Sequence, residues 1–192
     1  MVDFNKLIKV WQNALMKPSK TFKEQARHAN LKDGAIMFAI SGVIVALLTI
    51  ITSAADVTTI ISGPISTIIG WLIFSGILLL FAKLFGGKGN FNTQSYLLAV
   101  YGAPLAIVTG LISAVASLTG ISGISMLSGL LGIYGLYLLT LALKETHEYS
   151  MMRAFLTWAI LIIVFIVILV MVAATMLTTI LGIFGLGALS LA

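Results

Sequence analysis

The residues best suited to chemistry are Glu145, His147 and Glu148, which lie close together in one polar segment. Carboxylates and an imidazole at this spacing can bind a metal ion or change charge near neutral pH. A polar set between two apolar runs is more often a solvated loop, so these three residues are weak metal candidates only. Elsewhere the sequence predicts no metal, no cofactor and no catalytic residue.

A second candidate is the glycine-rich run Gly-Gly-Lys-Gly-Asn at residues 86–90. A phosphate-binding loop has the pattern Gly-x-x-x-x-Gly-Lys-Ser/Thr after a strand. This run lacks that pattern and lies between two apolar stretches. Glycines in such a place end one helix and turn the chain toward the next, so we expect a tight turn between helices here.

The rest of the chain is poor in reactive groups. It has no cysteine, which excludes disulfides, thiolate–zinc sites and cysteine nucleophiles. Every charged residue and histidine lies at or outside the boundary of an apolar run. Membrane enzymes and ion-coupled transporters instead carry ionisable residues inside their spans. The sequence therefore indicates a protein that is not an enzyme, and it disfavours coupled transport.

The elements that carry these residues are suited to a bilayer. Of the 192 residues, 60% are hydrophobic and 9% charged, whereas soluble domains are about 25% charged. At roughly 20 residues per crossing, the apolar runs predict an all-α bundle of five transmembrane helices, at about residues 34–54, 62–85, 95–118, 125–143 and 154–178. This membrane domain, residues 34–181, follows a cytoplasmic segment, residues 1–33, and precedes an apolar, glycine-rich tail, residues 182–192.

Positive charge predicts how these spans are oriented. With five spans, all 11 Lys and Arg residues fall on one side of the membrane, as the positive-inside rule requires for the cytoplasmic side. We therefore predict a cytoplasmic N-terminus and an outer C-terminus, in the cell (plasma) membrane. Orientation also accounts for the net charge of +5, so no nucleic-acid partner is expected.

The N-terminal segment predicts two amphipathic helices. Apolar residues share one face of the first helix: Phe4, Leu7, Ile8, Trp11 and Leu15. In one interpretation this helix lies among lipid headgroups, with Trp11 at the interface and Lys6 and Lys9 contacting anionic lipid or a partner. In the other, it packs on the membrane domain as a collar. The run Thr-Phe-Lys-Glu at residues 21–24 predicts a capping box that begins the second helix.

Small residues predict how the spans pack, because small side chains let helices approach closely in lipid. Gly102 and Gly110 lie in a row of the third span, and Gly129 and Gly132 lie in the fourth. We expect these two faces to pack against each other. Pro104 removes a backbone donor and predicts a kink in the third span.

In order and spacing, the motifs together resemble the Yip1 family of multi-pass membrane proteins. They are Trp11, the run Lys-Pro-Ser-Lys-Thr-Phe at 17–22, Gly-Gly-Lys-Gly-Asn-Phe at 86–91, Tyr-Gly-Ala-Pro at 101–104, Leu-Ala-Leu-Lys-Glu-Thr-His at 141–147 and Ser-Met-Met-Arg-Ala at 150–154.

The resemblance implies five spans with a cytosolic N-terminus, and oligomers with other membrane proteins. Eukaryotic members act in vesicle trafficking and bind Rab GTPases. The short N-terminal segment of this chain is similar to the prokaryotic branch, bacterial or archaeal, for which a Rab GTPase partner is not expected.

These observations favour an integral membrane scaffold or adaptor that recruits partners or lipids. The expected partners are the bilayer, anionic lipids and other membrane proteins in a homo- or hetero-oligomer. The alternative is a passive channel, a transporter or a lipid-moving protein, for which the predicted kink at Pro104 and the small-residue faces are the motivation.

Overall fold

The structure is a computed structural model that describes residues 4–53 and 55–183. Within these ranges the chain is helical, without strands. Two short helices come first, α1 (Phe4–Met16) and α2 (Pro18–Gln25), and a 3₁₀ turn, η1 (Ala26–His28), follows them. Five long helices then complete the described chain: α3 (Leu31–Ser53), α4 (Thr59–Leu84), α5 (Phe91–Thr119), α6 (Ser122–His147) and α7 (Met151–Ile183).

The five long helices are each long and apolar enough to cross a membrane. The prediction of an all-α membrane protein with five spans after N-terminal amphipathic helices is therefore confirmed. The helices are longer than the predicted spans, since α6 continues to His147 and α7 to Ile183. Most of the predicted tail, residues 184–192, lies outside the described residues, and the orientation across the membrane stays a prediction.

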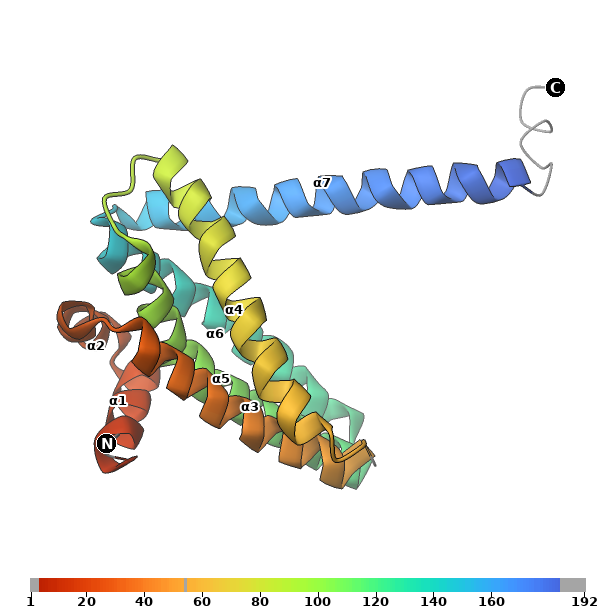
Figure 1. Ribbon diagram of the computed structural model, residues 1–192, viewed down its shortest axis with the longest axis horizontal. Helices are drawn as coiled ribbons and strands as arrows, with labels where there is room; N and C mark the ends of the chain where they lie inside the picture. Colours follow the sequence, from red (N-terminus) through yellow and green to blue (C-terminus); the bar gives the residue numbers. More distant parts are fainter. Residues whose placement is uncertain (1–3, 54, 184–192) are drawn as a thin grey trace.

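Helix α5 is the centre of the arrangement. It packs against α3, α4, α6 and α1, and Figure 1 shows it between α3 and α6. Its first half is almost wholly enclosed, because residues 94–101 are all buried. This stretch supplies much of the core to which the other helices attach.

Helix α7 departs from this bundle. Its first turns pack through Ala154 and Thr157, both fully buried, and the Trp158 indole donates to the Thr140 hydroxyl of α6 at 2.8 Å. Beyond them the helix extends away from the other four (Figure 1), and its apolar side chains from Ile162 to Val172 are exposed. In a bilayer, lipid tails are a suitable solvent for such a surface.

Local sequence explains where the helices begin and end. Asn90 caps α5, with its side chain accepting the Thr93 amide hydrogen at 2.9 Å. Gly120 ends the same helix with a left-handed φ of 67°. Ser150 accepts the Arg153 amide hydrogen at 3.4 Å at the start of α7.

The predicted capping box at residues 21–24 is wrong. Pro18 occupies the first turn of α2, a position where its missing N–H costs nothing. Thr21 therefore lies inside the helix, and its hydroxyl donates to the Lys17 carbonyl at 3.0 Å.

The predicted glycine packing is corrected in part. Cβ atoms added at Gly102 and Gly110 would lie 3.0 Å from Phe38 and 3.2 Å from Val45, both on α3. These two glycines therefore allow a close approach of α3, and not of α6.

Gly129 and Gly132 make no such close approach. A Cβ at either position would meet nothing within 4 Å, so neither glycine packs against the third span. Instead, Gly135 faces Leu105 of α5, at 2.9 Å. Helix α5 continues through the buried Pro104, and the kink there stays a prediction.

Candidate functional site at the charged end of the bundle

The glycine-rich turn between α4 and α5 packs directly on the end of α6. A Cβ at Gly87 would lie 2.5 Å from Nδ1 of His147 and 2.6 Å from the hydroxyl oxygen of Tyr149. A Cβ at Gly89 would collide with the carbonyl of Thr146. The glycines are therefore required by a close approach of backbone to side chains, in agreement with the predicted turn.

His147 joins this turn to the bundle. Its Nδ1 accepts the Gly89 amide hydrogen at 3.2 Å, and its Nε2 lies 2.8 Å from Oε1 of Gln94. Because Nδ1 faces a donor, Nε2 carries the proton and donates to Gln94. The Gln94 amide in turn donates to the carbonyl of Ser75 on α4 at 2.7 Å. Both side chains are 1% exposed.

Tyr149 and Lys83 complete the contact. The Tyr149 ring stacks on His147 with centroids 5.4 Å apart, and its hydroxyl donates to the carbonyl of Ala82. Burial raises the pKa of Tyr149, so the phenol stays a donor. The Lys83 ammonium donates to the carbonyl of Gly87 at 3.1 Å. We call Gly87, Gly89, Gln94, His147 and Tyr149 the loop clamp.

The three weak metal candidates have separate partners in the structure. Both ring nitrogens of His147 are engaged, Glu148 pairs with Lys88 at 3.0 Å, and Glu145 lies 3.9 Å from the ammonium of Lys144. Within the described residues, no three His, Cys, Asp or Glu side chains are arranged to hold a metal ion. The three residues are adjacent in sequence, but they point to different partners.

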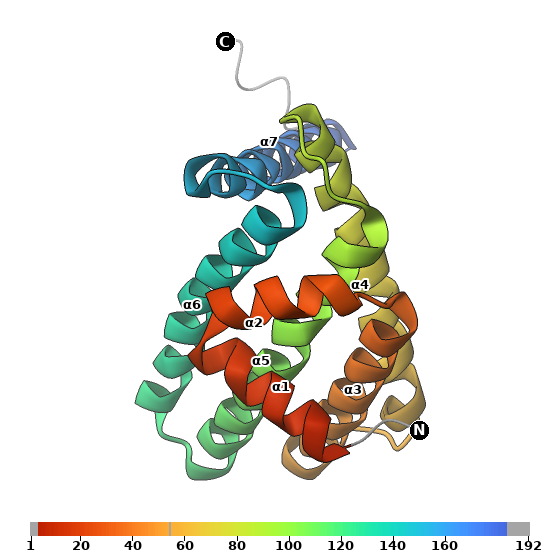
Figure 2. The same ribbon diagram turned by 90° about the vertical axis from the view of Figure 1, so that its left-hand side faces the viewer.

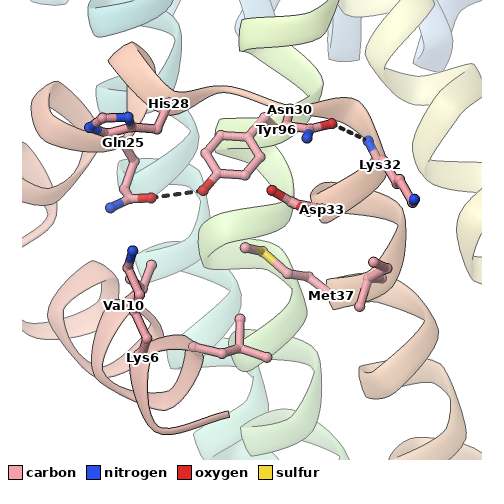
Figure 3. Close-up of a pocket in the computed structure, with 11 residues that line it drawn as sticks. Lys6, Val10, Gln25, His28, Asn30, Lys32, Asp33, Met37 and Tyr96 are labelled. Atoms are coloured by element: carbon pink, nitrogen blue, oxygen red, sulfur yellow. Dashed lines mark hydrogen bonds between the residues drawn. The ribbon is translucent and has the colours of Figure 1, made fainter. Parts of the chain in front are cut away.

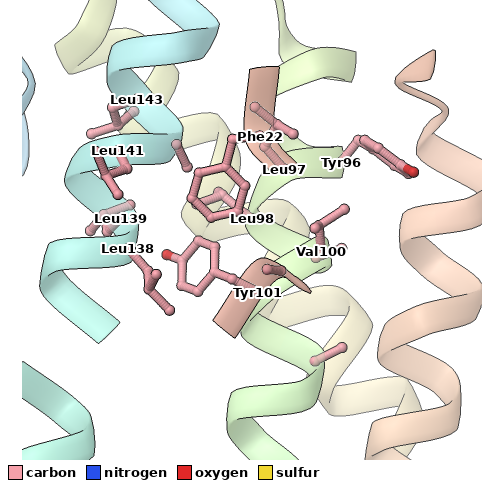
Figure 4. Packing of buried hydrophobic residues seen from close by; sticks show 14 of the residues in the cluster. Phe22, Tyr96, Leu97, Leu98, Val100, Tyr101, Leu138, Leu139, Leu141 and Leu143 are labelled. Atoms are coloured by element: carbon pink, nitrogen blue, oxygen red, sulfur yellow. The ribbon is translucent and has the colours of Figure 1, made fainter. Parts of the chain in front are cut away.

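The two N-terminal helices pack across α5 and α6 (Figure 2). Phe22 is fully buried against Tyr101, with ring centroids 5.9 Å apart (Figure 4). Leu7 and Ala14 are also buried, and the Tyr134 hydroxyl of α6 donates to the carbonyl of Leu15. Part of the apolar face of α1 therefore contacts protein, as in the collar interpretation, while Phe4 and Ile8 of the same face are exposed. We call residues 4–28, the segment that holds α1, α2 and η1, the collar.

The three predicted surface residues have different surroundings. Trp11 is partly buried and packs on the core, whereas Lys9 is exposed. Lys6 lines a cavity between the collar and the bundle. Contact of these residues with lipid or a partner stays a prediction.

That cavity has a volume of about 710 Å³. Its walls come from α1, the end of α2, η1, the start of α3 and α5 (Figure 3). Tyr96 on α5 donates its hydroxyl hydrogen to Oε1 of Gln25 at 2.7 Å, which links the collar to the bundle at this point. Sequence reasoning missed the cavity, because its polar residues come from five separate elements and the loop before α3. They are Lys6, Gln25, His28, Asn30, Lys32, Asp33 and Tyr96.

Comparison with known proteins assigns the family. A family model described as the Yip1 domain matches residues 13–174. The chain belongs to the Yip1 domain family. The match extends from the end of α1 into α7 and includes the loop clamp and Phe22. No curated protein and no solved structure matched the chain.

Membership identifies a multi-pass membrane protein, and the predicted resemblance is confirmed at the level of the family. The assignment to a prokaryotic branch stays a prediction.

Proposed function

We propose that this Yip1 domain protein is a non-enzymatic scaffold of the plasma membrane that gathers anionic lipid at its basic collar. The observation that carries this proposal is that the collar buries apolar side chains in the bundle and exposes basic ones. Apolar side chains such as Phe22 and Leu7 are buried in the bundle. The basic side chains of the same segment are exposed: Lys9, Lys17, Lys20, Lys23 and Arg27.

This division supports a lipid-binding role on physical grounds. Basic residues beside an anionic leaflet each contribute about 1 kcal/mol of attraction. For a free amphipathic helix, the entropy lost on ordering at the surface would offset part of this attraction. The collar is already held on the bundle by Phe22 and by the Tyr96–Gln25 hydrogen bond. Its cations are therefore in position before any lipid binds.

The loop clamp supports a structural role over a catalytic one. His147 is the buried imidazole of the described chain, and a general base needs a free lone pair near its substrate. Its lone pair at Nδ1 accepts from the Gly89 amide, and its Nε2 proton is directed to Gln94. The His147 side chain therefore joins α6 to the glycine-rich turn and to α5.

Lipid analysis of the extracted protein tests the proposal. The full chain is reconstituted in equal amounts of phosphatidylglycerol and phosphatidylcholine, extracted with a disc-forming polymer, and its co-extracted lipids are quantified by mass spectrometry. We expect phosphatidylglycerol to be enriched. Replacing Lys9, Lys17, Lys20 and Lys23 together with Gln should remove the enrichment while insertion is retained.

Two results would count against the scaffold. Equal lipid ratios around the wild type and the four-residue variant would rule out gathering by the collar. Flux of ions, solutes or lipids above that of empty vesicles would support the channel or transporter alternative.

A further inference from the structure

The cavity between the collar and the bundle has the dimensions of a ligand site. Its volume of about 710 Å³ falls within the range of roughly 300–1,000 Å³ that is usual for small-molecule pockets. It lies beside Leu31, the first residue of α3, where the chain passes from the polar segment into the first apolar span. Such a position corresponds to the headgroup level of a bilayer.

One wall of the cavity is basic. Lys6 on α1 extends toward this space from the collar, and the His28 ring on η1 lies at its edge, on the far side of Gln25 from Lys6 (Figure 3). Lys32 lies at the rim, where its amide donates to Oδ1 of Asn30 at 2.9 Å. A lysine ammonium forms charge-assisted hydrogen bonds with a phosphate group.

The opposite wall adds one carboxylate. Asp33, in the first turn of α3, is among the lining residues and is directed toward Tyr96 in Figure 3. It is the one acidic residue among those that line the cavity. A carboxylate accepts hydrogen bonds and donates none, so it favours a ligand that carries a donor beside its phosphate.

The floor of the cavity is apolar. Leu7 and Val10 contribute from α1, and Ile36 and Met37 from α3. Leu7 and Met37 are almost fully buried by the protein, whereas Val10 and Ile36 are half-buried and leave apolar area open to the cavity. A free phosphate would gain nothing from these side chains, whereas an acyl chain would bury apolar area at about 25 cal/mol per Å².

We propose that this cavity binds one glycerophospholipid whose headgroup carries both a phosphate and a hydrogen-bond donor, as glycerol and aminoethyl headgroups do. The phosphate lies at Lys6, the donor at Asp33, and the first part of an acyl chain along Val10 and Ile36. The inference rests on the proposed function only in placing the collar at the headgroup level. The cavity lipid is distinct from the lipid gathered by the exposed cations of the collar.

Native mass spectrometry of the full chain in detergent tests this site. Phosphatidylglycerol, phosphatidylethanolamine and phosphatidylcholine of equal chain length are titrated separately onto the delipidated protein. We expect one tightly retained phosphatidylglycerol or phosphatidylethanolamine, and weaker retention of phosphatidylcholine, whose headgroup has no donor.

Two substitutions separate the parts of the site. Lys6→Gln should weaken retention of phosphatidylglycerol by about fivefold, because one charge-assisted bond is lost. Lys144→Gln is the control, because this lysine lies on α6, outside both the cavity and the collar, and it should leave retention unchanged. Asp33→Asn should reduce the preference for phosphatidylethanolamine over phosphatidylcholine, because the charge-assisted hydrogen bonds from the ammonium N–H groups to a carboxylate become weaker bonds to a neutral carboxamide.

Soluble probes distinguish a lipid from a free phosphate. Inorganic phosphate and glycerol 3-phosphate should not displace the retained lipid, because neither contacts the apolar floor. Displacement by either one would overturn the proposal, as would equal retention by the wild type and Lys6→Gln.

Stability and bulk lipid provide the remaining controls. The melting temperature of each variant, measured without added lipid, should match that of the wild type. If Lys6→Gln melts lower, the headgroup preference of Asp33→Asn decides the question, and an unchanged preference overturns the proposal. Loss of the cavity lipid with continued enrichment of bulk phosphatidylglycerol would refute this site alone and leave the scaffold standing.

Discussion

The imidazole of His147 donates to the carboxamide of Gln94 across 2.8 Å, at a position where both side chains are 1% exposed. This pair connects the end of α6 to the start of α5, and Gln94 extends the connection to the Ser75 carbonyl of α4. Buried polar groups are costly unless they are satisfied. The charged end of the bundle is therefore held by directional bonds, in contrast to the apolar packing of the spans.

Replacing His147 with Leu should destabilise the protein by roughly 2–4 kcal/mol, because Gln94 and the Gly89 amide each lose a buried partner. Unfolding in mixed micelles measures the change. The other histidine, His28, is exposed, so His28→Leu should stay within about 0.5 kcal/mol of the wild type. Equal stability of the two variants would show that the loop clamp contributes nothing.

Substitutions of glycine by alanine should separate two classes of glycine. Gly87→Ala and Gly89→Ala should each cost roughly 1–3 kcal/mol, because the new methyl overlaps His147 or Thr146. Gly129→Ala and Gly132→Ala should be neutral or stabilising by up to about 1 kcal/mol, because both sites are open and alanine favours helix. A marked loss of stability at Gly129 or Gly132 would reveal a contact outside this chain.

Removing the Phe22 ring should release the collar from the bundle. Phe22 is fully buried, and a buried Phe→Ala change costs about 3–5 kcal/mol. The rate of tryptic cleavage after Lys20 or Lys23 should therefore rise in Phe22→Ala. Phe4 is 61% exposed, so Phe4→Ala should be cleaved like the wild type; cleavage of Phe22→Ala at that same rate would argue against a docked collar.

Single cysteines can test the predicted orientation, since the chain has none of its own. Ser19→Cys lies in α2, and Val57→Cys lies in the turn between α3 and α4. With a cytoplasmic N-terminus, a membrane-impermeant maleimide should label intact cells at residue 57 only. Labelling at residue 19 without permeabilisation would reverse the orientation.

The five spans could be predicted from the sequence because apolar run length and charge placement both depend on the bilayer. Helix ends were harder to predict. Helix α6 continues through Lys144 and Glu145 to His147, because the glycine turn packs on its end and gives those last residues partners. A hydropathy pattern does not contain that contact.

The sequence could point to single residues of the candidate site, but not to the contacts between them. His147 stood out by type, but the residues that define its role, Gly89 and Gln94, lie more than fifty positions earlier in the chain. Gly102 was correctly seen as a packing residue, yet its neighbour is Phe38 of α3. Periodicity gives the face of a helix and does not name the helix that it meets.

Electron paramagnetic resonance of spin-labelled lipids tests the central claim most directly. Vesicles hold either the wild type or the variant with Lys9, Lys17, Lys20 and Lys23 changed to Gln, and contain labelled phosphatidylglycerol or phosphatidylcholine. For the wild type we predict a larger motionally restricted fraction of phosphatidylglycerol than of phosphatidylcholine. For the variant we predict equal fractions. The same excess of restricted phosphatidylglycerol in both proteins would contradict a scaffold that gathers anionic lipid through its collar.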